Sequence, residues 1–212
     1  MSQPQPPADL NAFSQGMAAL WQRCDAAFAQ VAASFPAEVR CGSGCDDCCH
    51  AVFDLTPAEA LAMALAFRRL PRNARREALR RAEKAEALFD QVARRALEQS
   101  PEERLMTFSR ARVACPLLEK GRCLLYASRP LTCRLYGIPV ASGDEAHVCP
   151  RSGFDQGESY PTAGWDMVQA EAERLSRAAL ELAPQLGDER RDLARVLRWA
   201  QAQALTMEAL EA

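Results

Sequence analysis

Apolar residues recur every three or four positions in three parts of the chain, which is the spacing of one face of an α-helix. The first stripe runs from Phe13 to Phe35. Two further stripes run from Trp165 to Leu182 and from Leu193 to Ala204, with Pro184 and Gly187 between them. Each stripe predicts an amphipathic helix that turns its apolar face to a core.

Further helices are predicted in the middle of the chain. The tetrapeptide Thr-Pro-Ala-Glu at 56–59 is typical of a helix start, because threonine caps, proline suits the first turn and glutamate reaches back to the cap amide. The residues up to Phe67 are apolar nearly all round, so this helix is predicted to be buried, and Pro71 marks its end. A highly charged helix is predicted from about 72 to 98, and Ser-Pro-Glu-Glu at 100–103 repeats the start signal.

Two irregular segments, about 36–55 and 112–162, separate these helices and hold most of the glycine and proline. Strand signals are weak, and only the stretch from Arg134 to Val140 is predicted as a short extended piece. The sequence therefore predicts a mainly α fold, in which a helical shell surrounds a cysteine-rich, loop-built metal-binding centre. We expect a single domain over 1–212, with a cysteine-cluster region at about 40–150 and helices on either side.

Composition narrows the location and the class of partner. Of the 212 residues, 49% are hydrophobic and 25% are charged, and the net charge of −2 gives no general attraction to nucleic acid or anionic membranes. The beginning is polar and proline-rich, without the pattern of a signal peptide, and no run of about 18 apolar residues predicts a membrane span. We therefore expect a cytoplasmic protein with no membrane partner.

The nine cysteines change this picture most. Their number is odd, and a reducing cytosol disfavours stable disulfides, so grouped thiols indicate metal or redox chemistry. Cys24 falls on the first apolar stripe, where a thiol usually behaves as a small buried hydrophobe. A thioredoxin-like pair at Cys45 and Cys48 is disfavoured, because Asp46 and Asp47 would raise the pKa of both thiols.

The other eight cysteines lie in the two loop segments and are the candidate metal ligands: Cys41, Cys45, Cys48, Cys49, Cys115, Cys123, Cys133 and Cys149. Two thiols separated by two residues can wrap one metal. Adjacent side chains tend to diverge, so we do not expect Cys48 and Cys49 to be equivalent ligands of one ion. That geometry favours two sites, a multinuclear cluster or one spectator thiol. Eight thiols equal two sets of four, and four satisfy either a structural zinc or a [4Fe–4S] cluster.

A site with many cysteine thiolates and few histidines slightly favours an iron–sulfur cluster over zinc, and zinc is the alternative. His50 and His147 are not expected to be ligands while eight thiols are available. The negative charge of the thiolates needs nearby donors or cations. Four arginines near the cysteines can supply them: Arg40, Arg122, Arg129 and Arg134.

At these residues the chain resembles the YkgJ-type cysteine cluster proteins, a zinc- or iron-chelating CxxCxxCC family. The matching elements are Cys41-x3-Cys45-x2-Cys48-Cys49, the Cys-Pro-Leu-Leu at 115–118, the stretch from Cys123 to Arg134 with Tyr-x-x-Arg-Pro-x-x-Cys-Arg, and Cys149. The resemblance covers roughly residues 40–150 and implies that the eight cysteines are chelating positions. A related cluster occurs in flagellin lysine methylases, which keeps a transferase as an alternative, although no methyl-donor site is recognisable.

One charged segment offers a different kind of function. The predicted helix at 68–84 carries a local excess of arginine and lysine, which can contact phosphates. We expect a solvated helix face instead, because no stacking aromatics are interleaved. The sequence thus predicts a metal-chelating cysteine cluster protein with an iron–sulfur cluster and an electron-transfer or redox role. Structural zinc, a transferase and a nucleic-acid-binding module are the alternatives, and whether the protein is an enzyme stays open.

Overall fold

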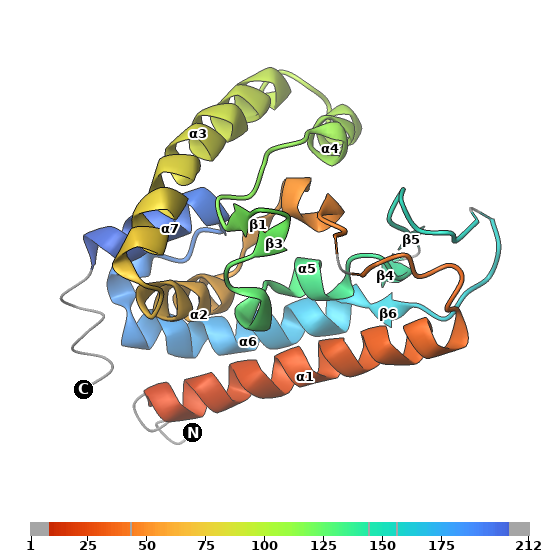
Figure 1. Cartoon of the computed structure of the whole chain (residues 1–212), viewed down its shortest axis with the longest axis horizontal. Coiled ribbons are helices and arrows are strands. Elements are labelled where there is room, and N and C mark those ends of the chain that lie inside the picture. Colours follow the sequence, from red (N-terminus) through yellow and green to blue (C-terminus); the bar gives the residue numbers. More distant parts are fainter. Residues whose placement is uncertain (1–8, 43, 144, 156, 204–212) are drawn as a thin grey trace, which may run out of the picture.

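Helices form most of the molecule in the computed structural model, which describes residues 9–42, 44–143, 145–155 and 157–203 (Figure 1). The α-helices are α1 (Leu10–Ser34), α2 (Pro57–Arg68), α3 (Arg72–Ala96), α4 (Pro101–Arg110), α5 (Leu131–Leu135), α6 (Trp165–Leu182) and α7 (Leu193–Ala202). Three short 3₁₀ helices are η1 (Asp47–His50), η2 (Tyr126–Ser128) and η3 (Pro184–Leu186). The prediction of a mainly α fold is confirmed. Among the described residues, no helix has both the length and the apolar character needed to cross a membrane.

The strands are short and serve to fasten loops. An antiparallel pair joins β1 (Asp54–Leu55) to β7 (Arg191–Asp192), and β2 (Leu118–Glu119) forms a hairpin with β3 (Arg122–Cys123). In a small sheet, β4 (Val140–Ser142) lies between β5 (Glu145–His147), which is antiparallel to it, and β6 (Ala163–Gly164), which is parallel. These pairings hold the irregular segments against the helices.

The apolar stripes form the interface between the helices. On α1, most positions predicted to face inward are buried, including Cys24 at 1% exposure, whereas Ala27 is half-buried. α1 packs on α6 and α5, and α2 packs on α6 and α7. Figure 1 shows β3 and α5 in the middle of the molecule, with α1 and α6 on one side and α3 and α4 on the other, while β4 and β5 lie at one end. Ala204, the last position of the predicted third stripe, lies outside the described residues.

α2 is buried nearly all round, as its apolar sequence predicts, and it begins with the predicted capping box. Its Glu59 carboxylate accepts hydrogen bonds from the Thr56 amide and hydroxyl, both at 3.1 Å, and from the Leu131 amide at 2.9 Å. Burial raises the pKa of Glu59, and these bonds from N–H and O–H groups oppose the rise. One buried carboxylate thereby joins the start of α2 to the start of α5.

The predicted extended piece from Arg134 to Val140 is wrong over most of its length. Arg134 and Leu135 belong to the last turn of α5, and only Val140 begins a strand. A helix as short as α5 has no intrinsic stability. It forms here because Glu59 accepts its first amide and because Leu131 and Leu135 are buried. Such tertiary support leaves no local signal in the sequence.

We predict that Glu59→Ala destabilises the fold by about 2–4 kcal/mol, because it leaves buried donors without a partner. Glu103→Ala is the matched control, since Glu103 completes the same capping box with Ser100 on the exposed start of α4. Its expected cost is about 0.5–1 kcal/mol. Urea unfolding followed by circular dichroism measures both, and equal losses would contradict the role given to Glu59.

Candidate metal centre

The first cysteine loop turns tightly and then enters η1. The Cys45 amide donates to the Gly42 carbonyl at 3.0 Å, and Gly44 has a φ of 92°, a left-handed conformation that suits glycine. Cys48 and Cys49 lie in η1, where the Cys49 amide donates to the Asp46 carbonyl at 2.9 Å. The coil of η1 brings the doubled cysteine to the inner side of the loop.

The second cysteine segment runs directly alongside the first. The Val113 amide donates to the His50 carbonyl at 3.1 Å, and the Cys115 amide donates to the Cys49 carbonyl at 2.7 Å. Two stretches that are far apart in the sequence are thus joined through their backbones at a pair of candidate ligands. The predicted meeting of the two loops is present in the fold.

A hairpin follows Cys115 and brings Cys123 back beside it. Lys120 and Gly121 form its turn, with φ of 50° and 74°, and β2 pairs with β3 so that Leu118 faces Cys123. Burial raises the pKa of Cys115 to about 12, while the N–H groups of Leu117 and Leu118 act in the opposite direction by bonding to the sulfur. Burial also raises the pKa of Cys123, opposed by the Leu125 amide. Amides directed at sulfur stabilise the thiolate form that binds metal.

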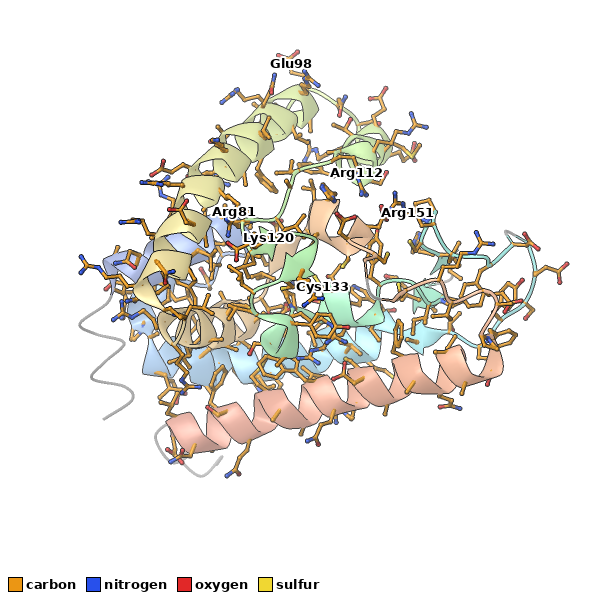
Figure 2. All side chains as sticks on the ribbon, viewed as in Figure 1. Arg81, Glu98, Arg112, Lys120, Cys133 and Arg151 are labelled. Atoms are coloured by element: carbon orange, nitrogen blue, oxygen red, sulfur yellow. The ribbon has the colours of Figure 1, made fainter. Side chains whose placement is uncertain are left out.

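Cys133 comes to the same place on α5, and Arg134 fixes the loop that leads there. Arg134 is buried at 2% exposure and donates to the carbonyls of Arg129, at 3.0 Å, and Ala127. It also pairs with Asp25 of α1 at 2.5 Å. Figure 2 shows Cys133 near the centre of the molecule. Arg134 therefore holds the Cys133 loop against α1, beyond its predicted role as a countercharge.

These segments surround one cavity of about 490 Å³. Seven of the eight candidate ligands line it: Cys41, Cys45, Cys48, Cys49, Cys115, Cys123 and Cys133. Apolar side chains complete the wall, among them Val113 and, from α3, Ala85 and Phe89. All nine cysteines of the chain are free thiols. The thiols of both loops therefore share one low-dielectric space.

Cys48 occupies the middle of this group. Cys133 and Cys49 act as hydrogen-bond donors toward its sulfur, which lowers the pKa of Cys48. The same interaction raises the pKa of Cys133 and of Cys49. Cys48 and Cys49, although adjacent in η1, both line the cavity, and their thiols interact with each other.

Cys149 is the eighth candidate, and it lies outside the lining of the cavity. It is 8% exposed, and its thiol donates to Asp47 Oδ2 at 3.6 Å. The Arg151 amide donates to its sulfur at 3.4 Å. The structure thus gathers seven of the predicted thiols around one cavity and sets the eighth just behind η1, against Asp47.

Asp47 joins several segments around the site, a role that the sequence analysis did not predict. Its carboxylate is 5% exposed and accepts hydrogen bonds from Arg112 at 2.6 Å and from the Tyr136 hydroxyl at 2.9 Å. Burial acts to raise its pKa, but Tyr136 and Arg112 hold the pKa of Asp47 below its usual value. No local pattern identifies this role, because its partners come from three separate segments.

Three of the four predicted countercharges line the cavity, namely Arg122, Arg129 and Arg134, whereas Arg40 does not. The positive charge of Arg129 contributes to lowering the pKa of Cys48 and opposes the rise at Cys123. Neither histidine lines the cavity, and the His50 ring lies 3.1 Å from the Asp46 carbonyl. The positive charge of Arg129 therefore offsets part of the rise in pKa that burial causes at Cys123.

The arginine-rich helix contributes to the same site. Arg81 of α3 donates from Nε to the Pro116 carbonyl at 2.8 Å, and its guanidinium lies 3.6 Å from the Glu119 carboxylate. Figure 2 shows Arg81 beside Lys120 of the hairpin turn. At least one arginine of the candidate nucleic-acid surface thus supports the loop that carries Cys115.

The cysteine thiols of the described residues converge, but they are not arranged as a complete set of ligands around one ion. Within residues 9–42, 44–143, 145–155 and 157–203, no three histidine, cysteine, aspartate or glutamate side chains stand ready to hold a single ion. The chemistry of the donor set nevertheless fits a thiolate-binding metal or cluster, since the sulfurs share a cavity, receive backbone amides and face arginines.

Comparison with known families agrees with this geometry. Residues 40–150 match the family described as "CxxCxxCC: Putative zinc- or iron-chelating domain", and the chain belongs to this family. The chain places three residues between Cys41 and Cys45, where the letters of that description have two. No curated protein and no solved structure matches the chain. The protein is therefore a cysteine-cluster, metal-chelating protein.

We predict that Gly137→Ala disrupts the position of Cys41 and lowers the metal content of the purified protein. A Cβ at Gly137 would lie 2.1 Å from Cys41 Sγ, and the φ of 98° adds backbone strain of about 1 kcal/mol. Gly121→Ala is the matched control, because its φ of 74° imposes similar strain while its Cβ meets open space. Elemental analysis of both variants is the measurement, and equal metal loss would refute the role of the Gly137 contact.

Proposed function

We propose that this chain binds an iron–sulfur cluster through thiolates of its cysteine cluster and takes part in electron transfer or redox sensing. The observation that carries the proposal is the convergence of seven thiols from two loops on one cavity. Iron–sulfur clusters are held by sets of four cysteine thiolates and need more room than a single ion. The cavity of about 490 Å³ gives ample space for such a group.

The surroundings of the cavity also support this choice. Amides that bond to cysteine sulfur, together with nearby positive charge, are the features by which proteins tune cluster potentials. Here the amides belong to Leu117, Leu118 and Leu125, and Arg129 supplies charge. When bound, a cluster of this kind takes up and releases one electron. The cavity reaches the surface at Arg122 and Tyr126, which are exposed, so a redox partner can approach there.

The free thiols favour a reducing compartment, and we propose the cytoplasm. A metal held by both loops also stabilises the fold, because its ligands come from distant parts of the chain. Structural zinc is the competing occupant, since amide-supported thiolates suit zinc as well. A transferase reaction and nucleic-acid binding have weaker support, because neither accounts for the cavity of thiols.

Anaerobic purification with elemental analysis tests the proposal. We expect a brown protein that contains iron and acid-labile sulfide in equal amounts, as the formula [4Fe–4S] requires. Cys115→Ser with Cys123→Ser should lower the iron content and the colour, whereas Cys24→Ala should keep both, because Cys24 of α1 is buried in the core. A colourless protein with stoichiometric zinc and no sulfide would replace the cluster with structural zinc.

A further inference from the structure

Cys149 has the surroundings of a metal ligand but does not line the cavity of the other seven thiols. The amides of Arg151 and Ser152 are directed at its sulfur, and the first lies at 3.4 Å. Cys115 and Cys123 have amide support of the same kind inside the cavity. Backbone amides of this kind also bond to the sulfur of metal-bound cysteines, so Cys149 has the contacts of a ligand at a place that the cavity does not include.

The thiol of Cys41 shares its surroundings with the thiol of Cys149. Cys41 Sγ lies 3.5 Å from the Tyr136 carbonyl, and the Tyr136 hydroxyl donates to Asp47, which also receives the Cys149 thiol. Cys41 and Cys149 therefore both border Tyr136 and η1. Burial first, and then the charges of Cys45 and Cys149, raise the pKa of Cys41 to about 12, which agrees with this proximity.

The remaining thiols gather at the opposite end. The backbone bond of 2.7 Å places Cys115 against Cys49, and the hairpin returns Cys123 to the same end. Cys133 reaches this group from α5, where Glu59 anchors the first turn. Cys48 lies between the two ends, near Cys49 and Cys133 and also near Cys41.

We propose that the eight thiols form two adjacent metal positions, a division that rests on the proposed function. The inner position takes Cys49, Cys115, Cys123 and Cys133. The outer position takes Cys41, Cys45, Cys48 and Cys149. Four thiolates complete the coordination of either zinc or a [4Fe–4S] cluster, so eight divide without remainder. The doubled cysteine of η1 then gives one ligand to each position and holds the two side by side.

Zinc binding by the full-length chain, stripped of metal and kept reduced, counts the positions directly. Native mass spectrometry should find two zinc ions on the wild-type chain and on Cys24→Ala, the control for loss of a thiol. The outer-pair variant, Cys41→Ser with Cys149→Ser, should keep one ion. The inner-pair variant, Cys115→Ser with Cys123→Ser, should also keep one.

A single zinc on the wild-type chain, or loss of both ions from the outer-pair variant, would overturn the two-position arrangement. If the inner-pair variant loses its helical circular dichroism, the outer-pair variant decides alone, because it must still keep one ion. Iron and sulfide are measured in the same preparation before stripping. A preparation that contains a cluster but binds only one zinc ion after stripping would contradict the two-position inference alone. A preparation that binds no metal at all would contradict the proposed function as well.

Discussion

The hydrogen bond from the Cys115 amide to the Cys49 carbonyl, at 2.7 Å, is the junction on which the rest of the centre depends. It joins two loops that contain only short helices and strands, and it sets one candidate ligand of each beside the other. A cavity lined by thiols exists only while this register holds. Buried backbone groups demand partners, so the junction also satisfies two polar groups that the loops would otherwise leave without one.

The helices act on the centre through single polar side chains that reach out of the core. Glu59 of α2 holds the start of α5, and Arg81 of α3 holds the Pro116 carbonyl beside Cys115. Arg134 ties the loop before Cys133 to Asp25 of α1. Helices α1, α2 and α3 thus each fix one ligand-bearing segment, which explains why a helical shell can carry a site built from irregular chain.

The sequence predicted the parts of this structure that repeat a local rule. The apolar stripes gave α1, α6 and α7, and the capping boxes at Thr56 and Ser100 gave the starts of α2 and α4. The cysteine spacing and family resemblance indicated the ligand set, and the family match confirms metal chelation. The sequence did not allow us to predict the role of Asp47, the helical conformation of Arg134 or the position of Cys149. Each depends on contacts between distant segments, which no local pattern records.

The central claim is that thiols of both loops bind metal at the cavity that they share, and peptide-resolved alkylation tests it most directly. The metal-loaded chain and the chelator-treated chain are labelled with a thiol reagent and compared by mass spectrometry. Cys48 and Cys49 should be protected together with Cys115, Cys123 and Cys133, and all should become reactive together when metal is removed. Protection of one loop while the other stays reactive in the loaded protein would contradict the account.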